Sequence, residues 1–187
     1  MHPFPGCERF WVNHMKKKNP LQTRGPCGSI LPRPLRFEDG TRADLALLCR
    51  HHYRPGMPAT YCLIRVARTR DRHSKNWRTI GVAVLSWPVP MMAARNRRFG
   101  MRGYKQCLRF ANSNLRTISR VIVHPQFRAA GIAQELVRQL ITRCPTRYIE
   151  SATSMGAFAS FLVRCGFKPL DTLGGEPAYF LLDRRDA

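Results

Sequence analysis

Acidic residues are scarce in this sequence, and one long stretch lacks them altogether. The 187 residues contain 11 Asp and Glu against 32 Lys and Arg, a formal charge of +21, and no acid occurs between Asp71 and Glu135. Arginine can offer paired donors to a phosphate, so this excess predicts a polyanionic partner. Nucleic acid is the commonest such partner, and the aromatic residues interleaved with the cations favour it. The alternative is a protein that is merely basic in composition. The interval holds the cations Arg72, Lys75, Arg78, Arg95, Arg97, Arg98, Arg102, Lys105, Arg109, Arg116, Arg120 and Arg128.

Paired cysteines and long apolar runs are also missing. The seven cysteines are odd in number and scattered, without a Cys-x-x-Cys pair, which argues against a zinc ribbon or a disulfide framework. No apolar run reaches the length of a membrane span, and the N-terminus lacks the apolar segment of a signal peptide. We therefore expect a cytoplasmic protein with reduced thiols and no membrane contact.

The chain divides into an arm and one domain. Residues 1–33 mix Lys, Pro, Gly and Ser without periodicity, which predicts a basic, partly ordered arm. Residues 34–187 carry regular patterns typical of a single α/β (α+β) domain with a mixed central sheet flanked by helices. The expected helices follow Thr41 and cover 131–144 and 154–167, and the expected strands cover 59–69, 78–90, 115–125, 147–153 and 177–183. An arginine-rich insertion, 91–114, is expected to be helical at each end and looped at Gly100 and Gly103.

The stretch "RVIVHPQFRAAGIAQELVRQLI" (120–141) carries the most specific signal. A strand runs into Pro125, and small residues then precede an amphipathic helix. Such a turn exposes backbone N–H groups at the positive end of a helix dipole, which favours a pyrophosphate ligand. Arg128 adds charge at the mouth, and the preceding strand can pair with an extended, amide-bearing ligand.

This stretch resembles the acyl-CoA-binding motif of the GNAT N-acetyltransferases, Arg/Gln-x-x-Gly-x-Gly/Ala. The later "FLVRCGF" resembles the second cofactor helix of that family, and the likeness covers roughly residues 42–183. The resemblance implies acetyl-CoA or a related acyl-CoA as cofactor and a GNAT-like fold. It also implies pairing of the pantetheine arm with the strand before the motif. The implied cofactor-binding residues are Val121, Val123, Arg128, Ala129, Ala130, Gly131, Ile132 and Ala133.

The chain departs from the family pattern at two positions. Ala133 stands at the last small position, which the family tolerates. Leu162 occupies the place where many members carry a tyrosine that protonates the departing CoA thiolate. A different group, or solvent, must therefore supply that proton.

Polar residues elsewhere suggest the catalytic group. His52 and Tyr53 lie at a predicted helix end, and Glu150 lies in the strand after the cofactor helix, which lines the acceptor cleft in GNAT topology. A carboxylate there, with histidine and tyrosine nearby, can deprotonate or orient an acceptor amine. The same group could hold a metal, although its spacing is unspecific, and Ser119 is a weaker catalytic candidate. The structural alternatives are a capping histidine pair and a Glu150 neutralised by an arginine.

A closer resemblance narrows the expected function. "HHYRPGMPAT", "GVAVLSWPVPMMAARNRRF" and "ESATSMGAF", with the strand–turn–helix, resemble the Mom-like branch of phage DNA-modification proteins. That likeness implies modification of the exocyclic amine of adenine in DNA, to a carbamoylmethyl-type group that blocks restriction. His52, Tyr53, Arg128 and Glu150 are the matching residues. The alternatives are a GNAT acetyltransferase acting on RNA, a protein or a small amine, and a non-catalytic nucleic-acid-binding protein. The sequence leaves the oligomeric state open.

Overall fold

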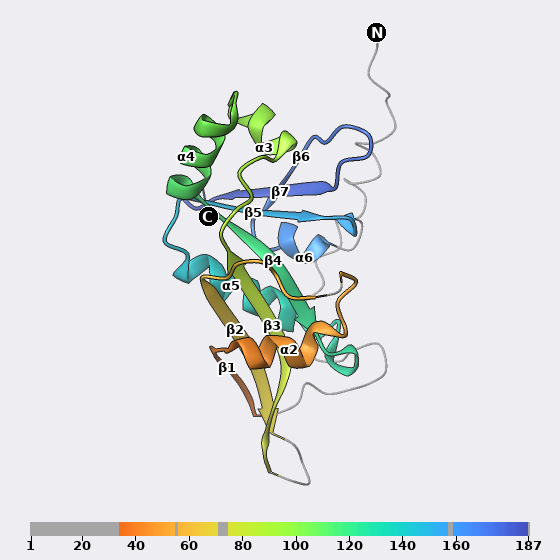
Figure 1. Ribbon diagram of the computed structural model, residues 1–187. Coiled ribbons are helices and arrows are strands. Elements are labelled where there is room, and N and C mark those ends of the chain that lie inside the picture. The colour runs from red at the N-terminus through yellow and green to blue at the C-terminus, as the bar shows by residue number, and fades with distance from the viewer. Residues whose placement is uncertain (1–33, 55, 71–74, 157–158, 187) are drawn as a thin grey trace.

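The computed structural model describes residues 34–54, 56–70, 75–156 and 159–186 (Figure 1). The predicted arm, 1–33, lies outside the described residues. The strands are β1 (Leu35–Asp39), β2 (Leu63–Arg70), β3 (Trp77–Ser86), β4 (Leu115–Val123), β5 (Tyr148–Thr153), β6 (Lys168–Leu170) and β7 (Ala178–Asp183). The helices are α2 (Arg42–Cys49), α3 (Ala93–Arg98), α4 (Tyr104–Asn114), α5 (Ile132–Arg143) and α6 (Ser160–Val163), with a 3-10 turn, η1, at Pro125–Phe127.

The strands form one mixed sheet, which confirms the predicted fold class. Its order is β1-β2-β3-β4-β5-β7-β6, and every neighbouring pair is antiparallel except β4–β5. The edge strands β1 and β6 were not predicted. Both segments are too short and too polar to show the alternation of a strand. The first is LRFED, five residues with two acids, and the second is KPL, three residues around a proline.

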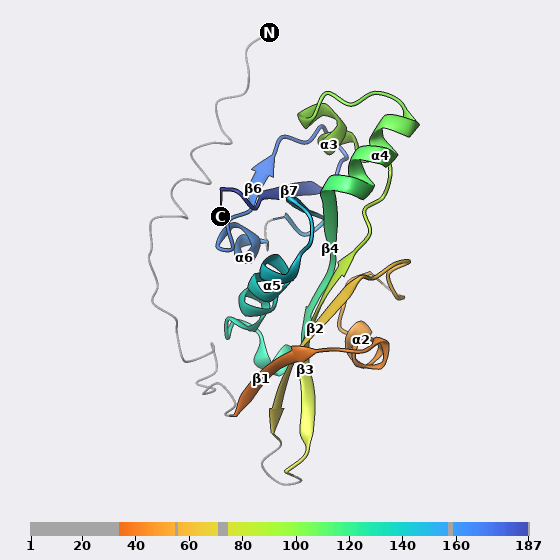
Figure 2. The same cartoon turned by 90° about the vertical axis from the view of Figure 1, so that its left-hand side faces the viewer.

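Helices cover both faces of the sheet (Figure 2). The apolar side of α5, which includes Leu136 and Leu140, packs with Leu162 of α6 and Ile149 of β5 in the largest buried cluster. On the other face, Leu45 of α2 packs on β2, β3 and β4. The α3–α4 insertion covers the β5–β7 half of that second face through a separate cluster. This third cluster consists of the buried residues Ala94, Leu115, Tyr179 and Leu181.

Two predicted helices agree with the sequence expectation to different extents. Helix α2 begins as expected at Thr41, whose side chain forms a reciprocal capping box with Asp44. Of the described residues in the helix expected over 154–167, those from Ser160 to Val163 form an α-helix, and the chain then turns through Gly166, whose φ is +92°. A left-handed residue costs glycine little, so Gly166 ends this segment where the sequence predicted.

The centre of the sheet opens between β4 and β5. These parallel strands pair only from Leu115–Tyr148 to Thr117–Glu150, and they diverge beyond that point. On its other side, β4 pairs Arg120 with Val84 and Ile118 with Leu85, so Ser119 is an extra, bulged residue. A bulge bends its strand and increases the local twist. The divergence and the bulge together leave a gap in the middle of the sheet.

Among the described residues, no helix combines the length and the apolar character needed to cross a bilayer.

Candidate functional site

A cavity of about 810 Å³ occupies the opening between β4 and β5. Its walls come from the end of α2, the second half of β4, the turn before α5, the end of β5 and α6. Of the residues predicted from sequence, the cavity is lined by His52, Tyr53, Ser119, Val121, Val123, Arg128, Ala129, Gly131, Ile132 and Ala133. Ala130 is not among the lining residues and packs against the main core instead, and Glu150 does not line the cavity.

The turn before α5 forms one end of this cavity. Ala129 and Gly131 both have positive φ, +61° and +80°, and Gly131 is the N-cap of α5. No side chain caps the helix, and the lining residues extend from Gly131 through Gln134, so the first turn of α5 borders the cavity. The first N–H groups of a helix have no partner within the helix. The turn therefore offers uncapped donors and a positive dipole end to an anion in this cavity.

Arg128 connects this turn to the other wall of the cavity. Its Nε donates to the carbonyl of Val123 at 3.2 Å, and its Nη2 donates to the carbonyl of His51 at 3.3 Å. Both contacts are to neutral acceptors, so the guanidinium charge is not neutralised by them. The side chain holds the end of β4 and the segment after α2 together while its charge remains beside the turn before α5.

The bulge in β4 places a chain of hydroxyl groups behind the cavity. The Oγ atoms of Ser119 and Ser86 lie 2.6 Å apart, and Ser86 donates to the carbonyl of Thr60 at 2.5 Å. Because Ser86 uses its proton on Thr60, it accepts the proton of Ser119. Ser119 thus presents acceptor lone pairs, and its hydroxyl orientation is fixed by β3.

The segment after α2 contributes His52 and Tyr53 to the cavity wall, and their ring centroids are 4.5 Å apart. The Tyr53 hydroxyl lies 3.3 Å from Oγ1 of Thr153, at the end of β5, and the tyrosine is 46% exposed. The backbone N–H of Arg54 donates to Nδ1 of His52 at 3.0 Å. Burial lowers the pKa of His52, and the positive charges of Arg120 and Arg54 lower it further. Nδ1 also lies 3.2 Å from the carbonyl oxygen of Arg54, so the two backbone neighbours favour opposite tautomers of a ring that is neutral at pH 7.

Glu150 lies on the other side of β5, beneath the α3–α4 insertion. Its carboxylate is 1% exposed and accepts from Nη1 of Arg95, 3.1 Å from both oxygens. Thr117 donates to it at 2.6 Å, and the hydroxyl of Tyr179 also donates to it. Burial and the neighbouring carboxylate raise the pKa of Tyr179, which keeps this phenol protonated. The structure therefore brings His52 and Tyr53 to the cavity but gives Glu150 an arginine partner outside it.

The charged residues that line the cavity are all arginines: Arg50, Arg120, Arg128 and Arg164. Among the residues that the structure describes, no Asp or Glu lines the cavity. In the described ranges, no group of three or more His, Cys, Asp or Glu side chains is placed to hold a metal ion. The separation of Glu150 from His52 and Tyr53 also means that these three residues do not form the metal site considered from the sequence.

Solved structures that share this fold include N-acetyltransferases. NAA60 from Arabidopsis thaliana in complex with acetyl-CoA superimposes with a TM-score of 0.54 at 14% identity, covering 79% of this chain and 96% of that one. The GNAT family N-acetyltransferase YhbS from Escherichia coli, in complex with CoA, gives a TM-score of 0.54 at 15% identity, covering 81% and 82%. A KacTA–DNA complex gives 0.50 at 13% identity, covering 81% and 94%. The chain therefore has the GNAT fold.

The sequence matches no protein-family model and no curated protein.

Sequence reasoning missed several residues of the site. The bulge at Ser119 and the Ser86 hydroxyl behind it depend on pairing between strands, for which the sequence carries no local signal. Thr153 was within the predicted strand but has no distinguishing motif. Arg95 is one of many arginines, and only its complete burial separates it from the others.

Proposed function

We propose that this chain is an acyl-CoA-dependent transferase that modifies the exocyclic amine of adenine in DNA. One observation carries the proposal. One cavity is lined by an uncapped helix N-terminus, by the strands at the opening in the sheet, and by a histidine and a tyrosine, and its charged lining residues are all arginines. The helix N-terminus and the opening in the sheet suit an acyl-CoA. The histidine, the tyrosine and the arginines suit a neutral acceptor attached to a polyanion. The likeness to acetyltransferases that hold acetyl-CoA or CoA supports the cofactor.

The turn from Arg128 to Ala133 would hold the diphosphate of the acyl-CoA. Positive φ at Ala129 and Gly131 sets the turn, and the small side chains leave the main chain accessible. Beyond the bulge, Val121 and Val123 would run beside the pantetheine arm, because β4 does not pair with β5 there. When bound, the acyl-CoA supplies an activated thioester carbonyl.

The lining of the cavity argues against a cationic acceptor. Polyamines, aminoglycosides and lysine side chains carry positive charge at pH 7, and four lining arginines repel them. The amine of adenine is neutral, so it needs no carboxylate to remove a proton before it attacks. The phosphates that flank the base suit the same arginines.

His52 and Tyr53 would act on the acceptor side. In the tautomer that accepts from the N–H of Arg54, the neutral His52 ring has an Nε2–H donor that can bond a ring nitrogen of adenine and orient the amine. Tyr53 would replace the family tyrosine that is absent at Leu162, which is 2% exposed and packed in the main core. Tyr53 would supply the proton that the departing thiolate takes up. The amine would lose one proton to solvent, and solvent would return one proton to Tyr53 by way of the Thr153 hydroxyl.

The base must leave the DNA stack to reach this cavity, since adenine inside a duplex is covered by its neighbours. Unstacking costs a few kcal/mol, which contacts to the flanking backbone can offset. A DNA complex of a KacTA protein with the same fold is compatible with a nucleic-acid partner.

Mass spectrometry of nucleosides tests the proposal. DNA, tRNA and total protein would be isolated from cells that express the wild type, Tyr53→Phe or Gly131→Val. We expect an adenine adduct in DNA from the wild type and little or none from the two variants. If DNA stays unmodified while tRNA or protein carries the adduct, the proposed DNA acceptor is wrong, but the assignment as an acyl-CoA-dependent transferase stands. No adduct in any fraction, together with no binding of CoA in calorimetry, would overturn both.

A further inference from the structure

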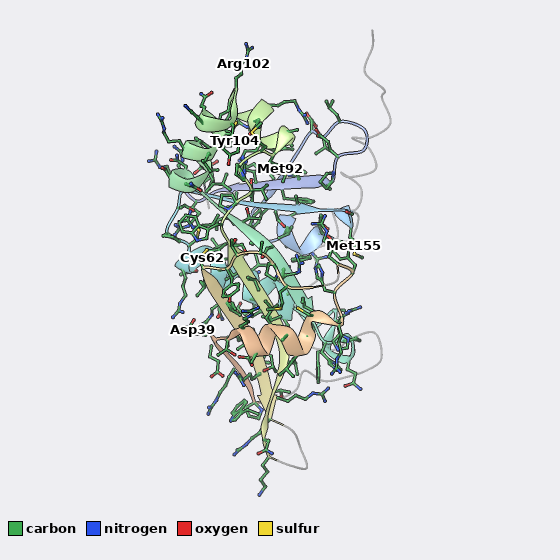
Figure 3. The ribbon with its side chains drawn as sticks, viewed as in Figure 1. Asp39, Cys62, Met92, Arg102, Tyr104 and Met155 are labelled. Atoms are coloured by element: carbon green, nitrogen blue, oxygen red, sulfur yellow. The ribbon has the colours of Figure 1, made fainter. Side chains whose placement is uncertain are left out.

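Helix α4 carries exposed cations at one end of the molecule. Arg102, Lys105 and Arg109 are exposed, and Tyr104, at the first position of the helix, is 58% exposed. Figure 3 shows Arg102 and Tyr104 at the end of the molecule that α3 and α4 form, away from Met155 at the cavity. The opposite side of α4 packs inward through Cys107. This α4 surface is therefore a fixed helix face and not a loose basic segment.

The arrangement of charge on α4 is unfavourable for an isolated helix. Lys105 lies in the first turn, where the helix dipole is already positive, and no acidic residue accompanies it. Arg109 is four residues later on the same face, and like charges at that spacing repel. Gly103 provides no side-chain cap. An anion bound to this face would offset the repulsion between the cations and would interact favourably with the positive end of the helix dipole.

Several arginines elsewhere in the structure pair with carboxylates. Arg65, Arg68, Arg143 and Arg147 each bond an Asp or Glu, at 2.5 to 2.9 Å. On the α4 surface, the described ion pairs include none for Arg102, Lys105 or Arg109. The charge of these three side chains is therefore not neutralised by a described carboxylate.

A groove of about 580 Å³ follows α4 and is lined by Lys105, Gln106, Arg109, Phe110, Ser113 and Asn114. Gln106 uses its carbonyl oxygen to accept from the backbone N–H of Arg102 at 2.9 Å, so its amide N–H groups remain as donors. Cations, amides and a hydroxyl repeated along one face are the groups that contact phosphates and sugars in protein–DNA complexes.

The α4 surface is rigidly connected to the catalytic half of the sheet. Asn114 is the last residue of α4, and Leu115 is the first of β4, the strand whose second half lines the cavity. The preceding helix, α3, is held by the buried pair of Arg95 with Glu150. A ligand on α4 therefore has a defined position relative to the cavity.

We infer that the α4 surface binds the sugar–phosphate backbone of double-stranded DNA, with Lys105 and Arg109 on phosphates. The choice of DNA rests on the proposed function, while the polyanion site rests on α4 itself. The surface would hold the duplex while one base enters the cavity.

Fluorescence anisotropy with a labelled 30-base-pair duplex tests this assignment on the full chain across a series of salt concentrations. The test variant is Lys105→Gln/Arg109→Gln. The matched control is Arg138→Gln/Lys168→Gln, which removes the same charge from exposed side chains on α5 and β6. We expect the test variant to bind about tenfold more weakly at 0.15 M salt, with a salt slope smaller by about two, because each lost phosphate contact removes about 0.9 from the slope. The control should stay near the wild type.

An equal loss of DNA affinity in both double variants would mean that affinity depends on the total charge of the protein and not on the α4 surface. That result would overturn the inference. Tighter binding of a single-stranded RNA of the same sequence would assign the surface to RNA and overturn it as well. Calorimetry with CoA on the same variants separates this outcome from the proposed function. Normal CoA binding with no effect of α4 on DNA refutes the surface alone, and DNA binding through α4 without CoA binding refutes the transferase alone.

Discussion

Arg95 of α3 and Glu150 of β5 form an ion pair that is almost completely buried. Nη1 of Arg95 lies 3.1 Å from both carboxylate oxygens, and the two side chains are 0% and 1% exposed. The other guanidinium nitrogen, Nη2, donates to the carbonyls of Val89 and Pro90 at 2.7 and 2.6 Å. The pair thus joins the arginine-rich insertion, the segment leading into it and the sheet at a single point.

Removal of the Glu150 carboxylate is expected to destabilise the fold. Glu150→Ala leaves the Arg95 charge buried without a partner, which costs about 3–5 kcal/mol in the free energy of unfolding. Denaturant unfolding measures this loss, and Glu135→Ala, at an exposed pair on α5, serves as the control with little change. If Glu150→Gln kept wild-type stability and CoA binding but lost transfer activity, the catalytic role suggested by the sequence would be restored.

Gly131 is expected to control CoA affinity. At φ +80° a β-carbon costs about 1–2 kcal/mol, so Gly131→Ala should distort the turn that borders the cavity and weaken CoA binding about tenfold. Isothermal calorimetry with CoA gives the affinity. Gly100→Ala is the matched control, since Gly100 has φ +62° but lies between α3 and α4. It should lose similar stability and keep CoA affinity, and a similar loss of affinity in both variants would exclude a specific role for the turn.

Tyr53 is expected to affect turnover far more than stability. Tyr53→Phe removes a half-exposed hydroxyl, so the fold should hardly change, whereas loss of a general acid lowers kcat by about a hundredfold or more. KM for the acyl-CoA should stay close to the wild-type value. Tyr61→Phe, at another exposed tyrosine, is the control. Unchanged kcat in Tyr53→Phe would leave protonation of the thiolate to solvent.

Acidification is expected to destabilise the protein before its carboxylates titrate. Burial lowers the pKa of His52 and of His124 below 6.5, and arginines near each ring lower it further. The unfolded chain therefore binds more protons than the folded chain in that range, and stability falls as pH drops below about 6.5. The carboxyl pKa values of Asp39, Asp44 and Asp183 are lowered, so their contribution is lost only near and below pH 4.

Thermal melting between pH 8 and 5.5 at constant ionic strength checks this dependence. The double variant His52→Gln/His124→Gln should show a flatter curve than the wild type over the same range. A wild-type curve that is already flat would contradict the lowered pKa values.

Local patterns were sufficient for most elements. Alternation predicted β2, β3 and β4, helical periodicity predicted α5, and Thr41 marked the start of α2, because these signals arise from neighbours in sequence. The insertion was also resolved into two helices separated at Gly100 and Gly103, both with positive φ. Edge strands and the short α6 were missed or overextended, since tertiary pairing and packing determine their extent.

The candidate site divides in the same way. The turn from Arg128 to Ala133 was predicted because a contiguous motif specifies it. The position of Glu150 was not, because strand alternation sends its side chain away from the cavity and only the fold supplies Arg95 as its partner.

By itself, the sequence determined a basic chain with a strand–turn–helix over residues 120–141, since both properties depend on composition and on adjacent residues. Only the tertiary structure decided which polar groups meet across the cavity and which acid forms an ion pair with a buried arginine. Those outcomes depend on the divergence of β4 from β5 and on the bulge at Ser119, which arise from contacts between distant segments.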